Sequence, residues 1–310
     1  MTAVGPPLPD RRFGILTFGV APYADLEHEW RWAEELGLDA AWITDTFAVP
    51  GLSDYEAWTT LAALARATTR LRIGTLITTV VARHPSLLAS AALTVDHISN
   101  GRLELGIGAG DEPADSDVFG LPPWAAGERL ERLDEYVRLL DRLLRGDSVA
   151  SVGRYYPVTR ASLVGPVQRP RPPIVVAAEG PRALRLAARH ADGWCTLGGR
   201  PTTRGAHVSD DDAGAATRAR VEHLERECRD AGRDPSAVRR VVLAFRAPVD
   251  PLSSLDAFDE FVGRYSELGM NEFVFYWPPP TVLRERQRPS AEQRARFEQI
   301  ASSRFARPSS

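Results

Sequence analysis

The sequence predicts a single (β/α)8 barrel, with an inserted hairpin after the fourth helix and a long loop after the sixth strand. Eight short β-rich runs alternate with eight longer segments of helical periodicity, a pattern typical of a parallel sheet covered by helices. The turn after the first run, Gly19-Val20-Ala21-Pro22, lacks the glycine-rich fingerprint of an open dinucleotide-binding sheet. No hydrophilic linker divides the chain, so we expect one barrel over 12–305 and flexible tails at 1–11 and 306–310.

Each element is predicted from the spacing of its apolar residues. The predicted strands are Arg12–Val20, Ala40–Thr44, Leu71–Thr79, Leu103–Ala109, Ile174–Ala178, Gly193–Thr196, Arg240–Ala244 and Glu272–Tyr276. The predicted helices are Leu26–Leu36, Asp54–Thr68, Pro85–Ile98, Ala126–Leu144, Arg182–His190, Ala213–Asp230, Leu255–Leu268 and Ala291–Ser303. The rhythm breaks over Asp147–Gln168, where SVASVGRYYPV predicts the hairpin. Gly198–Asp212, rich in Gly, Thr and Asp, predicts the long loop.

Composition excludes several classes of protein. All 38 basic residues are arginine, so a lysine Schiff base or a lysine general base is impossible. The formal net charge of −3 implies no general affinity for nucleic acid. The two cysteines and six histidines show no metal-type spacing, and we expect no metal. The sequence shows no secretory signal pattern and no membrane-length apolar run, so we expect a cytoplasmic protein without membrane contact.

In a barrel the site lies at the carboxyl ends of the strands. Asp45 follows the second strand, where it could bind a ligand or merely cap the following loop. Gly106–Gly110 would let the backbone approach a flat ligand, or would only form a tight turn. Asp111 and Glu112 follow it at the mouth.

The run Ala177-Ala178-Glu179-Gly180-Pro181-Arg182 leads from a strand through glycine into the start of a helix. Backbone N–H groups at such a start favour an anion, and Pro181 removes no donor that the helix needs. The run therefore predicts phosphate binding, with ordinary capping by Glu179 as the alternative.

Other residues near strand ends are weaker candidates. His84 could reach a ligand, whereas His97, late in a helix, suits packing or capping. Trp194 and Trp277 could stack on a ring system or simply fill the core. Arg83 and Arg182 could meet anionic groups.

Several segments together resemble the luciferase-like, flavin- and deazaflavin-dependent oxidoreductases. They are EWRWAEELGLDAAWITD (29–45), ATTRLRIGTLITTVVARHPSLLASAALTVDHISNGRLELGIGAG (67–110), GRYYPV (153–158) and PVQRPRPPIVVAAEGPRALRLAARHADGW (166–194). The resemblance covers about residues 12–197 in order. It implies a non-prolyl cis peptide near Thr75, Leu76 and Ile77, behind the ring of the cofactor. It also implies that the phosphate of the cofactor lies at Glu179–Arg182.

Within this superfamily, GRLELGIGAG, the FGLP turn at 119–122 and the GRYYPV hairpin are most similar to members that use the deazaflavin coenzyme F420. The resemblance implies cofactor contacts at Thr75, Leu76, Ile77, Gly108, Ala109, Gly110, Ala178, Glu179, Gly180, Pro181 and Arg182. The chain departs from the sugar-phosphate dehydrogenases of this group at two positions. It has Asp45-Thr46 where they have Asp-His, and Asp111 where they have a glutamate.

These observations predict an F420-dependent oxidoreductase that transfers a hydride to or from an unidentified small organic substrate, with Asp45 and Asp111 as the catalytic candidates. One alternative is an FMN-dependent monooxygenase supplied with reduced flavin by a partner reductase. Another is a barrel that binds a flavin without catalysis. The resemblance also implies a homodimer. A barrel hydrolase is disfavoured because no nucleophile motif or metal cluster is present.

Overall fold

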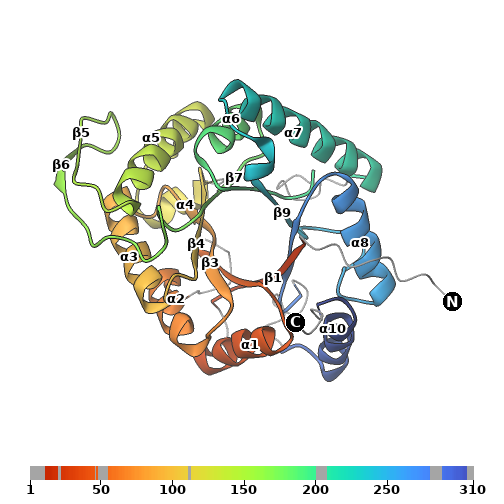
Figure 1. The fold of residues 1–310 in the computed structure, drawn as a ribbon. Helices are drawn as coiled ribbons and strands as arrows, with labels where there is room; N and C mark the ends of the chain where they lie inside the picture. Colours follow the sequence, from red (N-terminus) through yellow and green to blue (C-terminus); the bar gives the residue numbers. More distant parts are fainter. Residues whose placement is uncertain are drawn as a thin grey trace.

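Eight parallel strands close into a barrel in a computed structural model of the chain. The structure describes residues 11–19, 22–45, 47, 55–110, 113–199, 208–279 and 288–305. The barrel strands are β1 (Arg12–Thr17), β2 (Ala40–Asp45), β3 (Arg72–Thr79), β4 (Leu103–Gly108), β7 (Ile174–Ala177), β8 (Gly193–Thr196), β9 (Arg239–Leu243) and β10 (Glu272–Tyr276). Neighbouring strands follow the order β1-β10-β9-β8-β7-β4-β3-β2 (Figure 1). The predicted (β/α)8 barrel is confirmed.

Helices surround the barrel on its outer side (Figure 1). They are α1 (Tyr23–Glu35), α2 (Ala57–Ala67), α3 (Pro85–Ile98), α4 (Pro113–Val118), α5 (Ala126–Leu144), α6 (Pro181–His190), α7 (Asp210–Asp230), α8 (Leu255–Glu267) and α10 (Ala291–Arg304). The main core lies between the strands and this ring of helices, whereas a smaller cluster fills the barrel itself. None of the described helices is long and apolar enough to cross a membrane.

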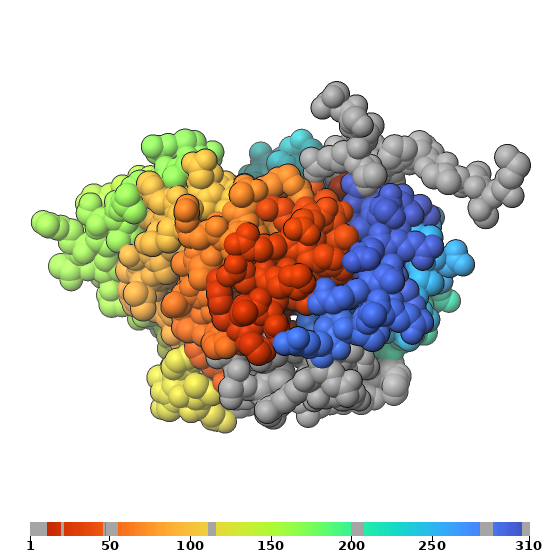
Figure 2. All heavy atoms as spheres, turned by 90° about the horizontal axis from the view of Figure 1, so that it is seen from below, coloured from red at the N-terminus to blue at the C-terminus, as the bar shows by residue number. Residues whose placement is uncertain are grey.

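The predicted hairpin is present as β5 (Val149–Ser151) and β6 (Val158–Ala161), which pair in antiparallel fashion. It projects from the side of the barrel beyond α3 and α5 (Figures 1 and 2). The predicted tails fall on residues outside the described part of the chain, apart from Arg11.

Most of the predicted elements differ from the structure by one to three residues at one or both ends, and the start of α7 and the presence of α4 are the differences that matter for the loops. The prediction placed a loop up to Asp212, but α7 begins at Asp210 because the Ser209 hydroxyl accepts a hydrogen bond from the Asp212 N–H and three aspartates occupy the first turn. The short helix α4 lies inside a segment that was predicted to be a loop.

β3 carries a bulge that shapes the barrel wall. The stretch Thr75–Thr78 is one residue longer than the paired stretches of β2 and β4, and the peptide bond between Leu76 and Ile77 is cis. The cis peptide implied by the family resemblance is therefore present. An added Cβ on Gly106 would lie 2.2 Å from the Thr75 carbonyl oxygen, and one on Gly108 would lie 2.0 Å from Ile77 Cδ1. The close packing of β4 against this bulge thus explains why positions 106 and 108 are occupied by glycine.

We expect Gly106→Ala to destabilise the protein by about 3 kcal/mol, because the colliding oxygen is backbone and cannot swing aside. The matched control is Gly214→Ala in α7, where an added Cβ meets nothing within 4 Å and removal of glycine from a helix gains about 1 kcal/mol. Urea unfolding monitored by circular dichroism measures both. Equal effects at the two positions would contradict the close packing of β3 on β4.

The amino ends of the strands are closed by a cluster of five charged side chains. Glu104 and Glu272 are fully buried and form ion pairs with Arg12, Arg72 and Arg239 at 2.5–3.3 Å. Burial raises the pKa of both carboxyl groups, while the arginines oppose it. Trp42 lies above this cluster, packed against Gly14 and Gly74. The barrel is therefore filled at this end, and its other end forms the mouth.

Candidate active site

The described side chains at the mouth are mostly apolar or aromatic. Ile77, Ala177, Leu197, Phe245 and Tyr276 are partly buried and pack on the inner cluster that contains Leu76 and Cys195. The rings of Phe18 and Tyr276 stack with centroids 5.8 Å apart. Such a surface suits a flat ring system.

The side chain of Asp45, the last residue of β2, does not face the open mouth. It lies on the outer side of the barrel wall, between β3 and α2. Its side chain is 1% exposed and binds Arg83 through two hydrogen bonds of 2.5 and 3.1 Å. Trp58 Nε1 and the Thr78 hydroxyl also donate to it, at 3.2 and 2.7 Å. Burial raises the pKa of Asp45, although Arg83 and Thr78 oppose that shift. The carboxylate thus braces the bulge, and its direct action on a substrate stays a prediction.

The start of α6 offers free backbone donors. Gly180 is the N-cap residue, no side chain caps the helix, and a Cβ added there would meet nothing within 4 Å. The N–H groups of Arg182 and Ala183 make no hydrogen bond to any residue that the structure describes. The structure thus speaks against the alternative that Glu179 caps this helix.

Glu179 instead points toward β8, where its Oε1 accepts hydrogen bonds from Thr196 Oγ1 at 3.0 Å and Leu197 N at 2.7 Å. Arg220 of α7 forms an ion pair with Glu179 Oε2 at 3.0 Å. Its buried Nη1 nitrogen has no hydrogen-bond partner in the described part of the chain. Arg220 therefore lies beside the uncapped start of α6, whose first turn also contains Arg182, an arrangement that favours an anion.

Four weaker candidates have structural partners. Trp194 and Trp277 are fully buried outside the barrel, where their Nε1 atoms donate to Ala178 O and Glu29 Oε2, both at 2.7 Å. His84 caps α3 by accepting from Ser86 N, and His97 contacts Gly165 O at 2.8 Å. The suggestion that either tryptophan stacks on a ligand is therefore wrong.

The second catalytic candidate, Asp111, lies outside the described residues, as do Thr46 and Glu112. Of the cofactor candidates, Ala109 and Gly110 follow β4 at the mouth, and Gly110 has a φ of +76°. Among the described residues, no group of three or more His, Cys, Asp or Glu side chains could hold a metal ion.

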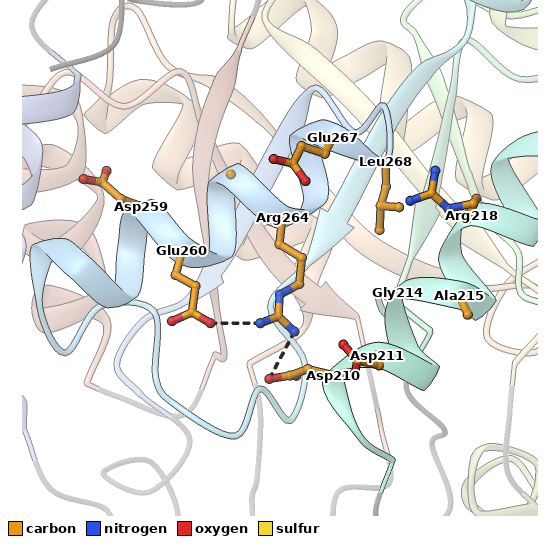
Figure 3. A pocket seen from close by; sticks show the side chains of 11 residues that line it. Asp210, Asp211, Gly214, Ala215, Arg218, Asp259, Glu260, Arg264, Glu267 and Leu268 are labelled. Carbon is orange, nitrogen blue, oxygen red and sulfur yellow. Dashed lines mark hydrogen bonds and ion pairs between the residues drawn. The ribbon is translucent and has the colours of Figure 1, made fainter. Parts of the chain in front are cut away.

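A groove of about 670 Å³ lies between α7 and α8 (Figure 3). Arg264 crosses it and binds Asp210 at 3.1 Å and Glu260 at 2.8 Å. Its lining comes from the two helices and the residue after α8, with no contribution from the barrel strands. We therefore place the candidate site at the mouth and not in this groove.

Comparison with known families agrees with this geometry. The model of the luciferase-like monooxygenase family matches residues 8–295, which is nearly the whole chain. The chain belongs to this family. Members of the luciferase-like family therefore supply the relevant comparisons.

An F420-dependent glucose-6-phosphate dehydrogenase from Amycolatopsis mediterranei is 32% identical over 207 residues, 65% of this chain and 60% of that protein. A 5,10-methylenetetrahydromethanopterin reductase from Archaeoglobus fulgidus is 32% identical over 208 residues, 66% of this chain and 58% of that protein. The chain thus spans about three fifths of the length of these relatives.

Solved structures share the fold. An F420-dependent tetrahydromethanopterin reductase from Methanopyrus kandleri has a TM-score of 0.74 at 19% identity, with 96% of this chain and all of that chain covered. A monooxygenase from Streptomyces bottropensis has the same TM-score at 20% identity, covering 94% and 98% of the two chains. At this identity the likeness establishes the barrel alone.

Sequence reasoning did not single out Thr44, Phe245 or Tyr276 as candidates, although all three lie at strand ends. The alternation of side chains along β2, β9 and β10 could have identified them. It distinguishes the side chains that point into the barrel from those that point to the helices.

Proposed function

We propose that the chain is an oxidoreductase that binds coenzyme F420 across the barrel mouth and transfers a hydride between it and a small organic substrate. The observation that carries this proposal is the uncapped start of α6, which lies beside a flat apolar mouth with a bulged β3. The similarity to the F420-dependent glucose-6-phosphate dehydrogenase named above supports the choice of cofactor. When bound, F420 supplies a hydride donor or acceptor at C5 of its deazaflavin ring.

The residues present fit such a cofactor in two places. Thr75, Leu76 and Ile77 form the bulge against which the ring would lie, and Gly108–Gly110 would flank it. The backbone from Ala178 to Arg182 would hold the phosphate, with open space above Gly180. Arg182 and Arg220 would offset its charge.

The chain's own residues would orient the ring and exclude water from it. Asp45 would act by holding β3 through Thr78, whose hydroxyl lies 3.1 Å from that of Thr75. Thr75 in turn donates to Gly106 O at 3.2 Å, so one chain of hydrogen bonds links Asp45 to the wall behind the ring.

A reduced-FMN monooxygenase is the second candidate, favoured by the description of the family. The two functions differ in their use of oxygen, because a reduced flavin activates O₂ whereas a 5-deazaflavin essentially does not. Only the FMN alternative requires a partner reductase that supplies the reduced cofactor.

The test is a fluorescence titration with F420 and, in parallel, with FMN in both redox states. We expect a micromolar or tighter Kd for F420 and at least tenfold weaker binding of FMN, a difference of about 1.4 kcal/mol. Preference for reduced FMN, with oxygen consumed as product forms, would establish the monooxygenase instead. Binding of either cofactor without turnover of any substrate would support the non-catalytic alternative.

A homodimer is a further proposal. Exposed apolar side chains, which include Leu87 on α3 and Phe119 and Leu121 after α4, are candidates for its interface. Light scattering of the purified protein measures the mass directly, and a value near 34.0 kDa would exclude the dimer.

A further inference from the structure

Two hydroxyl groups at the mouth have no hydrogen-bond partner among the described residues. Thr44 is 6% exposed, and its Oγ1 is buried without a partner. The hydroxyl of Tyr276 likewise makes no hydrogen bond within the part of the chain that the structure describes. Buried hydroxyls such as that of Thr44 are almost always paired in proteins, so a ligand partner is a physical expectation there, and the Tyr276 hydroxyl is available to the same ligand.

Both side chains point into the barrel. Trp42 lies in the inner cluster, Ile43 lies in the outer core and Asp45 binds Trp58 of α2, so Thr44 points inward by alternation. Tyr276 packs on the inner cluster and stacks on Phe18, which directly follows β1, the strand between β10 and β2.

The two hydroxyls also lie at the same height. Barrel strands tilt, so residues of equal height are offset by about one residue per strand from their hydrogen-bonded register. The closed end gives the direction of this offset. Following the strand pairing from β3 through Ala40 of β2 leads from Arg72 to Gly14 of β1. However, Arg72 binds the same carboxylate, Glu104, as Arg12, which lies two residues before Gly14. Two strands of separation therefore correspond to an offset of two residues.

The same rule applies to Tyr276, which is in register with Trp42 through Leu16. Because β10 and β2 are two strands apart, the residue of β2 at the height of Tyr276 lies two residues beyond Trp42. That residue is Thr44. Neighbouring strands are about 4.8 Å apart, so the two backbones are separated by roughly 10 Å. Inward side chains from both strands can therefore reach one small group between them.

The position of Tyr276 suits contact with a substrate more than contact with the cofactor. In the barrel order, β10 lies diametrically opposite β4, and β9 lies opposite β3. A ring that lies against the bulge at Leu76 and Ile77 and is flanked by β4 would therefore present its other face to β9 and to the adjacent strand β10, which carries Tyr276. Arg246, which follows Phe245, has a φ of +49°, a backbone conformation rare for a side chain of this type and common at functional sites. Its guanidinium lies 4.9 Å from the centroid of the Phe245 ring.

We propose that Tyr276 and Thr44 bind the oxygen of a carbonyl substrate, and that Tyr276 supplies the proton when this carbonyl is reduced to an alcohol. Reduced deazaflavin, when bound, would supply the hydride of the new C–H bond and would itself be oxidised. The C=O π electrons would pass to oxygen, and the Tyr276 O–H bond would break to give the alcohol. The tyrosinate would regain its proton from water. The proposal rests on the F420 function proposed above.

The electrostatics agree with these roles. Burial raises the pKa of Tyr276, with Arg246 opposing that shift, so the hydroxyl keeps its proton at neutral pH and can donate. An alkoxide is a far stronger base than a tyrosinate, so proton transfer is favourable once the hydride has moved. Arg246 would then stabilise the tyrosinate.

The test labels the ζ-carbon of tyrosine with 13C in the holoenzyme with oxidised F420, and Tyr276→Phe identifies the Tyr276 resonance. We expect cyclohexanone to move this resonance, whereas methylenecyclohexane, which has CH₂ in place of the oxygen, leaves it in place. If the chemical shift of the Tyr276 resonance does not change on addition of cyclohexanone while F420 is bound, the inference is overturned. Failure of F420 to bind would instead contradict the proposed function.

A kinetic test follows for any carbonyl compound that the wild type reduces. Tyr276→Phe keeps the ring on Phe18, so the Kd of F420 should stay within twofold while kcat falls by about 10²–10⁴. Thr44→Val should lower kcat about tenfold. The control Tyr155→Phe removes a surface hydroxyl that donates to Glu131, and it should change neither value. Full activity of Tyr276→Phe would contradict the proton-donor role.

Discussion

Arg83→Met is expected to destabilise the protein by about 3–5 kcal/mol at pH 8, because it leaves the Asp45 carboxylate buried without its cation. Arg83 also pairs with Glu56, but that carboxylate is 43% exposed and stays solvated, so its loss adds little. Urea unfolding of both proteins, monitored by circular dichroism, gives the difference in free energy of unfolding.

The pH dependence of this difference has a defined sign. Burial already raises the pKa of Asp45 in the folded protein, and removal of Arg83 raises it further. A carboxyl group with a raised folded pKa contributes stability below its unfolded pKa, and this contribution is lost as the pH rises through the folded pKa. The destabilisation by Arg83→Met should therefore be small at acid pH and complete at pH 8.

Asp45→Asn is the second variant of this comparison, because it removes the negative charge of the side chain and keeps its shape. The double variant Asp45→Asn/Arg83→Met should be more stable at pH 8 than Arg83→Met alone. A cost below 1 kcal/mol for Arg83→Met, or one that does not vary with pH, would show that the pair does not brace β3 as the structure indicates.

Gly180→Asp is expected to raise the Kd of F420 at least tenfold, since it puts a carboxylate where the phosphate is proposed to lie. The same substitution should stabilise the folded protein by a few tenths of a kcal/mol, because aspartate caps a helix better than glycine and α6 has no side-chain cap. Weaker binding with greater stability cannot be explained by general damage to the fold.

Gly165→Asp is the control, as it adds the same charge at a position where a Cβ meets nothing within 4 Å and which contacts His97 far from α6. It should leave the Kd unchanged. Fluorescence titration measures binding, and thermal unfolding measures stability. Equal Kd values for Gly180→Asp and the wild type would exclude the start of α6 as the phosphate site.

The architecture could be predicted from sequence because eight repeats of strand and helix leave few alternatives. Helix α3 was predicted to the residue, since Pro85 can occupy only the first turn and Asn100-Gly101 ends the helix, both with positive φ. The helix α4 was missed because its six residues, PADSDV, are too few to show helical periodicity.

The site was less accessible to sequence reasoning, because its contacts join residues far apart in the chain. Asp45 and Arg83 are separated by 38 residues, and each alone suggested a ligand contact. Trp277 follows Tyr276 directly, yet the first is buried among helices and the second faces the mouth. Only the inward and outward alternation of side chains along β10 distinguishes the position of Tyr276 from that of Trp277. The bulge of β3 was expected from the family resemblance and not from the residues themselves.

The charged cluster that closes the amino ends of the strands has a consequence for the order of events. With one end of the barrel filled, two ligands bound inside it must share a single entrance. Whichever lies deeper has to arrive first and depart last. A flat cofactor on the wall and a substrate above it would then follow compulsory-order kinetics, in which excess substrate traps the spent cofactor and slows the next cycle.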